Sequence, residues 1–290
     1  MAGVAGTGAS KAIAKEPLTA ALIEQWRVIG TLLPELTDAQ WASATPLPGW
    51  RVQDVVAHIV GTELMLSGVD TPASADDLSQ LEHVRNRVGL HVERWVAAFR
   101  GCTSQQVLAK YREITAHRAG VLEAMTQSDF DAPTETLSGP FPYGRFMRVR
   151  LFDCWFHEHD IRDAVGIAGD ETGQAAEYAL TELLEPSGPG IRDEGGLGYV
   201  IGERAKAPRG SIVTFELVGP ITADVHVAVD SRAVVEKPDR PSTVTIRLPS
   251  TVFTRLCGGR TRAVDHWDRI AIRGDDELGR RVLADMAYTI

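Results

Sequence analysis

The sequence predicts an α+β protein with a helical N-terminal domain and a smaller mixed C-terminal domain. Up to Glu185 apolar residues recur every three or four positions, which is typical of helices, and after it they alternate, which is typical of strands. The proline- and glycine-rich stretch Pro186–Gly190 marks the change. We therefore expect a disordered N-terminus at 1–16, a helical bundle at 17–185 and an α+β domain at 186–290.

The N-terminal part contains five tracts with helical periodicity. The first begins at Pro17, a residue that suits the first turn of a helix because that turn leaves its amides unpaired. The second follows Trp50, and the last ends at Gly166, a typical C-terminal residue of a helix. The other boundaries come from capping residues and prolines: helices at 76–99, 104–125 and 145–165, and a long loop at 128–144. Long helices with mostly short connections are typical of a bundle.

The C-terminal part alternates between apolar and polar residues and predicts a mostly antiparallel sheet with two helices. Gly258 and Gly259 end the first of these helices. The predicted strands lie at 211–218, 223–229, 243–248 and 269–272, and the predicted helices at 250–257 and 277–287.

Charge and composition exclude several classes of protein. A net charge of -9 argues against a nucleic-acid binder, which needs a surplus of cations, and no stretch approaches the roughly 20 apolar residues of a membrane-spanning helix. The N-terminus lacks the apolar run of a secretory signal. The three cysteines, Cys102, Cys154 and Cys257, are too few and too scattered for a disulfide framework. We expect them to be small buried side chains in a cytoplasmic protein.

The most informative helix contains Asp153 and His157. At about 100° per residue these side chains lie about 40° apart, one turn from each other, so one helix face offers a carboxylate and an imidazole to a metal ion. Asp160 continues that face, whereas His159 projects to the other side. This spacing is also common on solvated helices, and Asp153 has a second option in an ion pair with Arg150.

A third ligand has to come from another helix. His58 is the only polar residue between Val55 and Val60, and by itself it fits an interfacial histidine better than a metal ligand. His91 and His117 have polar neighbours and are expected to be solvated. The two C-terminal histidines have no carboxylate at ligand spacing: His226 lies on a strand and His266 near a turn.

Two motifs resemble a known family. Leu47-Pro-Gly-Trp-Arg-Val-Gln-Asp-Val-Val-Ala-His58 is similar to the first signature of the mycothiol-dependent maleylpyruvate isomerase family, and Asp153-Cys-Trp-Phe-His157-Glu-His-Asp-Ile161 matches the spacing of its Glu-x-x-x-His-x-x-Asp-Ile signature. The resemblance implies a DinB-like four-helix bundle that holds a divalent metal through His58, Asp153 and His157. It also implies a C-terminal domain similar to sterol carrier proteins. The sequence departs from the family pattern at two positions, where Asp153 replaces a glutamate and His159 replaces an aromatic residue.

The resemblance implies a function as well. Three ligands leave a coordination position open, as in catalytic sites, and imidazole and carboxylate ligands favour zinc first among divalent metals. A thiol bound there becomes a thiolate, which is the reactive form. The expected protein is therefore a transferase or isomerase in which a metal-bound thiolate of mycothiol attacks a small electrophile, and it is a monomer or a homodimer.

Other residues receive supporting roles in this interpretation. Asp160 is expected to support His157, and Arg150 to contact a substrate or pair with a carboxylate. Arg85 and Arg87 are basic candidates near the rim of a pocket, with a solvated helix face as the alternative. The alternative function is a non-enzymatic protein that binds a metal or a hydrophobic ligand.

Overall fold

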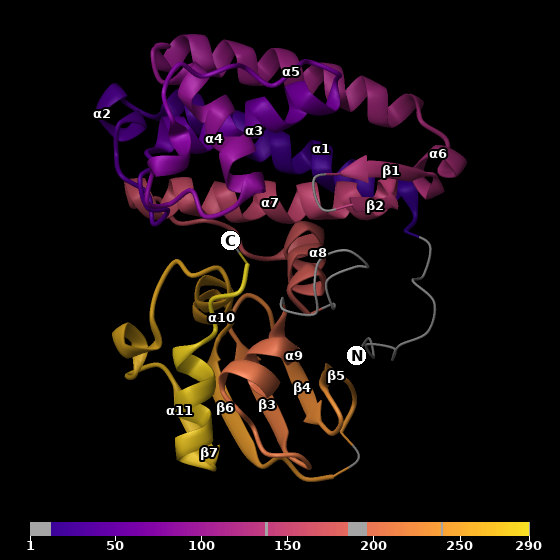
Figure 1. Cartoon of the computed structure of the whole chain (residues 1–290), viewed down its shortest axis with the longest axis vertical. Coiled ribbons are helices and arrows are strands. Elements are labelled where there is room, and N and C mark those ends of the chain that lie inside the picture. Colours follow the sequence, from indigo (N-terminus) through magenta and orange to yellow (C-terminus); the bar gives the residue numbers. More distant parts are fainter. Residues whose placement is uncertain (1–12, 137–138, 185–195, 239, 290) are drawn as a thin grey trace. The chain divides into compact units, whose positions relative to one another are not determined.

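The computed structural model describes residues 13–136, 139–184, 196–238 and 240–289 (Figure 1). These residues divide into two compact units, one at 13–136 and 142–169 and the other at 139–141 and 170–289. The main division therefore falls at Gly169, earlier than the change of pattern in the sequence. The predicted disordered segment and the proline- and glycine-rich stretch lie mostly outside the described residues. The predicted start of the first helix needs a small correction, because that helix already begins at Lys15 and Pro17 is its third residue.

The first unit is built on four long helices, as the periodicity predicts. Helix α3 packs against α5 and α7, and α1 packs against the same two helices, while α4 lies on α3. Short helices connect them. The bounds are α1 Lys15–Leu32, α2 Asp38–Trp41, α3 Val52–Leu66, α4 Arg87–Phe99, α5 Ser104–Ala124, α6 Gln127–Asp131 and α7 Tyr143–Val165.

Caps place the ends of these helices. The side chain of Thr103 accepts a hydrogen bond from the amide of Gln106 and begins α5, one residue before the predicted cap Ser104. Gly166 ends α7 in the left-handed conformation, with φ 71°, as predicted. These side-chain and backbone contacts satisfy amides and carbonyls that have no partner within the helix.

Two predictions for this unit are wrong. No helix spans 76–99 in this described stretch: Asp77 caps only the short turn Leu78–Gln80, and Asn86 caps α4 by accepting from Gly89 at 2.8 Å. Local hydrogen bonds from Asp and Asn compete with helix continuation. The predicted loop 128–144 contains α6 and two short paired strands, β1 (Pro133–Thr136) and β2 (Gly139–Pro142).

The second unit contains a mixed five-stranded sheet in the order β5-β4-β3-β6-β7. Strands β3 and β6 are parallel and the other neighbouring pairs are antiparallel, so the mostly antiparallel prediction is confirmed. Strand β5 was not predicted. The strands are β3 Ile212–Val218, β4 Ala223–Val229, β5 Ala233–Val235, β6 Val244–Pro249 and β7 Ala271–Gly274, and the helices are α8 Gly173–Leu184, α9 Leu197–Tyr199, α10 Ser250–Cys257 and α11 Asp276–Ala284.

Alternation along β3 creates the core of this unit. Val213, Phe215 and Leu217 are buried on one face of the sheet, and α10 packs against β3 and β6. The rings of Phe215 and Phe253 meet edge to face with centroids 5.2 Å apart. Among the described residues, no helix is both long and apolar enough to cross a membrane.

A glycine determines how closely α3 and α4 approach in the first unit. A Cβ atom on Gly61 would lie 2.4 Å from the Cβ of Trp95. We predict that Gly61→Ala lowers the free energy of unfolding by about 1–3 kcal/mol, because the two helices must separate. Gly120→Ala on α5 is the matched control, since its Cβ would meet nothing within 4 Å, and it should raise stability by about 1 kcal/mol. Equal effects of the two substitutions in urea unfolding would contradict the close packing.

Candidate metal centre

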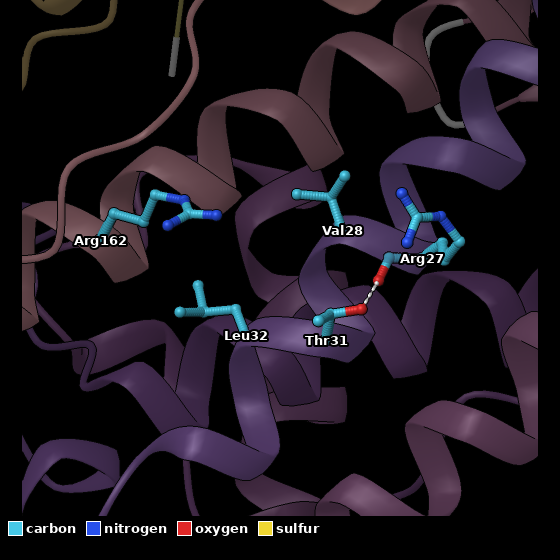
Figure 2. A pocket seen from close by; sticks show the side chains of 5 residues that line it. All are labelled: Arg27, Val28, Thr31, Leu32 and Arg162. Carbon is cyan, nitrogen blue, oxygen red and sulfur yellow. Dashed lines mark hydrogen bonds between the residues drawn. The ribbon is translucent and has the colours of Figure 1, made fainter.

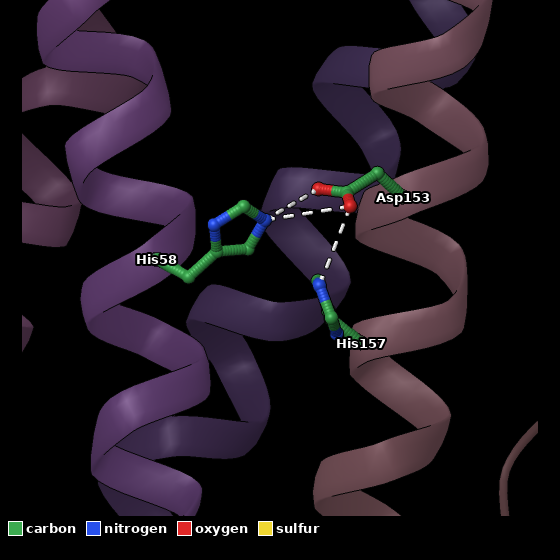
Figure 3. A group of neighbouring side chains, drawn as sticks. All are labelled: His58, Asp153 and His157. Atoms are coloured by element: carbon green, nitrogen blue, oxygen red, sulfur yellow. Dashed lines mark hydrogen bonds and ion pairs between the residues drawn. The ribbon is translucent and has the colours of Figure 1, made fainter. Parts of the chain in front are cut away.

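The structure brings His58, Asp153 and His157 together inside the helical unit. Helix α3 supplies His58, and α7 supplies the other two side chains one turn apart, as Figure 3 shows. One ligand atom from each lies within 4.8 Å of the others. The two imidazole rings face each other edge to face at 4.9 Å between centroids. The three residues that the sequence analysis selected therefore converge on one point.

The carboxylate of Asp153 lies between the two imidazoles. Its Oδ2 is 3.1 Å from Nε2 of His58, and its Oδ1 is 3.3 Å from Nε2 of His157. Both histidines are buried, while Asp153 keeps 26% of its side chain exposed. The cluster is thus enclosed on the histidine side and accessible at the aspartate.

A buried chain of charges holds Asp153 from behind. The Arg150 guanidinium donates to Oδ2 of Asp153, and it also donates from Nε to Glu63 at 3.0 Å. Glu63 is completely buried on α3 and accepts a second hydrogen bond from Arg118 of α5, at 3.0 Å. Arg118 continues the chain to the hydroxyl of Tyr143 at 2.6 Å. Arg150 thus pairs with two carboxylates. The sequence analysis gave this pairing as the alternative to a substrate contact.

Asp160 holds the ring of His157. Its Oδ2 lies 2.9 Å from Nδ1 of His157, so Nδ1 carries the proton and Nε2 faces the other two residues of the cluster. This is the arrangement that orients histidine ligands in metalloproteins. His58 differs, because its buried Nδ1 has no hydrogen-bond partner among the described residues.

The charges of the cluster shift its pKa values. Burial opposes ionisation of Asp153, but His157, His58 and Arg150 outweigh it and hold the pKa of this carboxyl well below its usual range. Burial also opposes a charge on His157, but Asp153 and Asp160 raise its pKa to about 9. Burial lowers the pKa of His58, and Asp153 only partly compensates. Without a metal, His157 and Asp153 therefore form an ion pair beside a neutral His58.

The donor set fits a divalent cation. Zinc bonds to nitrogen and oxygen of about 2.0–2.1 Å separate neighbouring ligands in a tetrahedron by about 3.3 Å. Oδ1 of Asp153 lies close to this distance from both imidazoles, at 3.4 Å from Nε2 of His58 and 3.3 Å from Nε2 of His157. Two imidazoles and a carboxylate, with no thiolate, are ligands of zinc and related metals. Three donors also leave a position open.

The other candidate residues lie outside this cluster. His159 packs its ring on Trp155 at 4.5 Å, away from the cluster as predicted. His117 is exposed as predicted, whereas His91 is half-buried beside Thr71 and Met65, which corrects the solvated prediction. Arg85 and Arg87 are exposed. On the sheet, His226 contacts Thr214, and His266 contacts Thr261 in a short turn.

A shallow cavity of about 270 Å³ lies elsewhere in the helical unit (Figure 2). It is lined by Arg27, Val28, Thr31, Leu32 and Arg162. Both arginines are engaged: Arg27 binds Glu24, and Arg162 binds Glu158. This cavity shares no lining residue with the candidate metal centre.

Sequence reasoning gave no role to several residues around the cluster. Glu63 stands within the apolar helix α3, and an acidic residue in such a tract is a usable signal of a buried ion pair. Trp50 packs against both histidines, with ring centroids 5.4 Å from His58 and 6.2 Å from His157. Its partner Glu93 is 43 residues away, and no local pattern connects the two.

A helical bundle with a candidate divalent-metal centre, combined with a second α+β unit, is an architecture that known proteins share. Residues 22–162 match the model of the mycothiol maleylpyruvate isomerase N-terminal domain, and residues 194–281 match the model of the C-terminal domain of the same family. The chain belongs to the mycothiol-dependent maleylpyruvate isomerase family. The resemblance in the two sequence motifs is thereby confirmed.

Solved structures agree on the fold. Crystal structures of the mycothiol-dependent maleylpyruvate isomerase and of a histidine-to-alanine mutant of it each superpose with a TM-score of 0.56 at 13% identity, covering 90% of this chain and 93% of that chain. At this identity the likeness shows the fold alone. No curated protein matches the chain.

The raised pKa of His157 predicts a pH-dependent metal affinity. A metal must displace the proton on His157, so binding should release about one proton at pH 7 and tighten by about tenfold per pH unit up to pH 9. Calorimetry in buffers of different ionisation enthalpy counts the protons. Asp160→Asn removes one carboxylate that raises this pKa, so the dependence should move to lower pH. An affinity constant from pH 6 to 9 with no proton release would contradict the ion pair.

Proposed function

We propose that this protein is a divalent-metal-dependent, mycothiol-linked transferase or isomerase acting on a small electrophile. The observation that carries the proposal is the convergence of two imidazoles and one carboxylate from α3 and α7, in a chain of this family. Zinc is the metal that this donor set favours first. The aspartate that replaces the family's glutamate reaches both imidazoles, which supports a working site.

The residues of the chain prepare the site for a thiol. A divalent cation held by His58, Asp153 and His157 would lower the pKa of a thiol bound to it, so that the thiol would react as a thiolate near pH 7. Asp160 keeps the Nδ1 proton of His157 in place, and Arg150 holds one oxygen of Asp153. The exposed part of Asp153 lies on the side from which thiol and substrate enter.

The reacting thiol comes from a co-substrate. Burial raises the pKa of the Cys154 thiol to about 12, although Arg150 favours the thiolate, and burial likewise raises that of Cys257 to about 12. Both side chains are buried as predicted, so they remain thiols at neutral pH. Cys102, predicted to be buried, is half-exposed, but its sulfur is absent from the donor cluster.

The proposed reaction is attack of the thiolate on an electrophilic carbon. The new carbon–sulfur bond forms as the π electron pair of a carbon–carbon double bond moves onto the neighbouring carbon. If that carbon takes up a proton, the thiol stays attached and the protein is an S-transferase. If the pair re-forms the double bond after rotation about the carbon–carbon bond and the thiolate leaves, the protein is a cis–trans isomerase. Its expected place is the cytoplasm, where cysteines remain reduced, and it works as a monomer or a homodimer. The competing function is binding of a metal or a hydrophobic ligand without turnover.

Metal content tests the ligand set. Purified protein should hold about one divalent ion per chain, and His58→Ala or His157→Ala should remove it, because two ligands do not retain the ion through purification. His117→Ala on the exposed face of α5 is the matched control and should leave the content unchanged. Elemental analysis measures all four proteins. Equal metal content in the wild type and both ligand variants would refute the site.

Thiol consumption tests the reaction. The metal-loaded protein should accelerate the loss of mycothiol in the presence of a reactive electrophile, or the conversion of a cis-enedioate-type substrate to its trans form at constant thiol. Removal of the metal by a chelator should abolish either activity, because the thiol is then mostly protonated. Stoichiometric metal with neither activity across a panel of electrophiles would favour the binding protein over the enzyme.

A further inference from the structure

We propose that Trp50, held by the buried carboxylate of Glu93, is the positioning residue that orients His58 in the cluster. The inference rests on the proposed function in so far as the cluster holds a metal. It accounts for the Pro48-Gly49-Trp50 motif, to which the proposed reaction assigns no role.

The ring of His58 lacks the support that the ring of His157 has. Asp160 fixes His157 by a hydrogen bond to Nδ1 at 2.9 Å, whereas the buried Nδ1 of His58 has no partner among the described residues. With a metal on Nε2, the atom that contacts Asp153 at 3.1 Å, no hydrogen bond among the described residues orients the His58 ring. A histidine ligand binds metal well only when its ring is oriented, so packing must supply the orientation.

Trp50 supplies that packing. Its indole ring is tilted 39° to the ring of His58 and 41° to that of His157, with centroids 5.4 Å and 6.2 Å away. The three rings form one contact group, because the two imidazoles are themselves 4.9 Å apart. Rotation of the His58 ring would push against the indole. Trp50 thus acts on the cluster through ring contact, while its indole nitrogen is used elsewhere.

Glu93 fixes the indole. The Nε1 of Trp50 donates to Oε2 of Glu93 at 3.0 Å, and the same carboxylate meets Nε2 of His83 at 3.0 Å and Nη2 of Arg100 at 2.6 Å. Glu93 is only 1% exposed. A buried carboxylate is costly unless donors or opposite charges surround it; here Trp50 and His83 contact Oε2, and the Arg100 guanidinium forms an ion pair with Oε1.

The turn before Trp50 packs closely against His83, one of the residues that contact Glu93. Gly49 has φ 78°, and a Cβ atom there would lie 2.6 Å from Nδ1 of His83. Only glycine fits this close approach and this backbone conformation. The carbonyl of Trp50 accepts hydrogen bonds from the amide and the hydroxyl of Thr45 at 3.0 Å and 2.9 Å. Both the backbone and the ring of Trp50 are therefore held.

The test compares Trp50→Phe, Glu93→Gln and the control Trp95→Phe. The first keeps an aromatic ring but loses the N–H. The second keeps the shape of Glu93 but removes its charge, which weakens its contacts with Trp50, His83 and Arg100. The indole of Trp95 is buried on α4 and packs against Gly61, so its loss reports general destabilisation. Melting temperature, zinc affinity by chelator competition and the ¹H–¹⁵N spectrum of the histidine rings are measured for each protein.

We expect Trp50→Phe to weaken zinc binding by about tenfold, the low end of the effect of residues that orient ligands, and Glu93→Gln to weaken it less. In the metal-free protein the ring signals of His58 should broaden or split in both variants. Trp95→Phe should lower the melting temperature and leave affinity and spectrum unchanged. The double variant that combines Trp50→Phe and Glu93→Gln should bind zinc no more weakly than Trp50→Phe alone, because Glu93 acts through Trp50.

Two outcomes separate this proposal from the proposed function. If the wild type binds no zinc but the His58 signals still broaden in the variants, Trp50 orients the ring and the metal function is wrong. Unchanged ring signals in both variants, with or without zinc binding, would overturn the positioning role. So would an affinity loss in Trp95→Phe as large as that in Trp50→Phe.

Discussion

The carboxylate of Asp153 organises the polar interior of the helical unit. A carboxylate largely withdrawn from water requires compensating charge or hydrogen bonds, and Asp153, with 26% of its side chain exposed, obtains them from two imidazoles and the guanidinium of Arg150. Arg150 in turn requires Glu63, which requires Arg118. These ion pairs connect α7 to α3 and α3 to α5, so one chain of charged side chains links three helices of the bundle.

This chain also sets the alignment of α3 against α7. His58 faces Asp153 and Glu63 faces Arg150, so the two helices run antiparallel and meet through polar contacts at two levels. A shift of either helix along its axis would break both contacts and leave buried charges unpaired. The free-energy cost of such a shift is far larger than that of a shift between helices packed through apolar side chains. The geometry of the candidate metal centre is therefore a consequence of how the bundle assembles. It also explains how an aspartate, shorter than glutamate by one methylene, still reaches both imidazoles.

The sequence predicted features that depend on local periodicity. The apolar spacing predicted α1, α3, α5 and α7, and the helical angle placed Asp153 beside His157. The contact between His58 and these two residues depends on how the helices pack. The residue pattern alone could not predict this contact, and only the family resemblance indicated His58 as the third ligand. Glu63 was missed because its partners Arg118 and Arg150 lie 55 and 87 residues away, and Glu93 because its partner Trp50 lies 43 residues away. The helix predicted from 76 onward failed because side-chain caps at Asp77 and Asn86 compete with helix continuation.

The central claim is that one cation binds between α3 and α7 at the three side chains in Figure 3. Anomalous diffraction from a crystal of the zinc-loaded protein tests it most directly, because the signal locates the metal without reference to activity. We predict one strong peak within about 2.0–2.2 Å of both imidazole Nε2 atoms and a carboxylate oxygen. A peak bound by other residues, or none at this position in a crystal soaked with excess zinc, would contradict it.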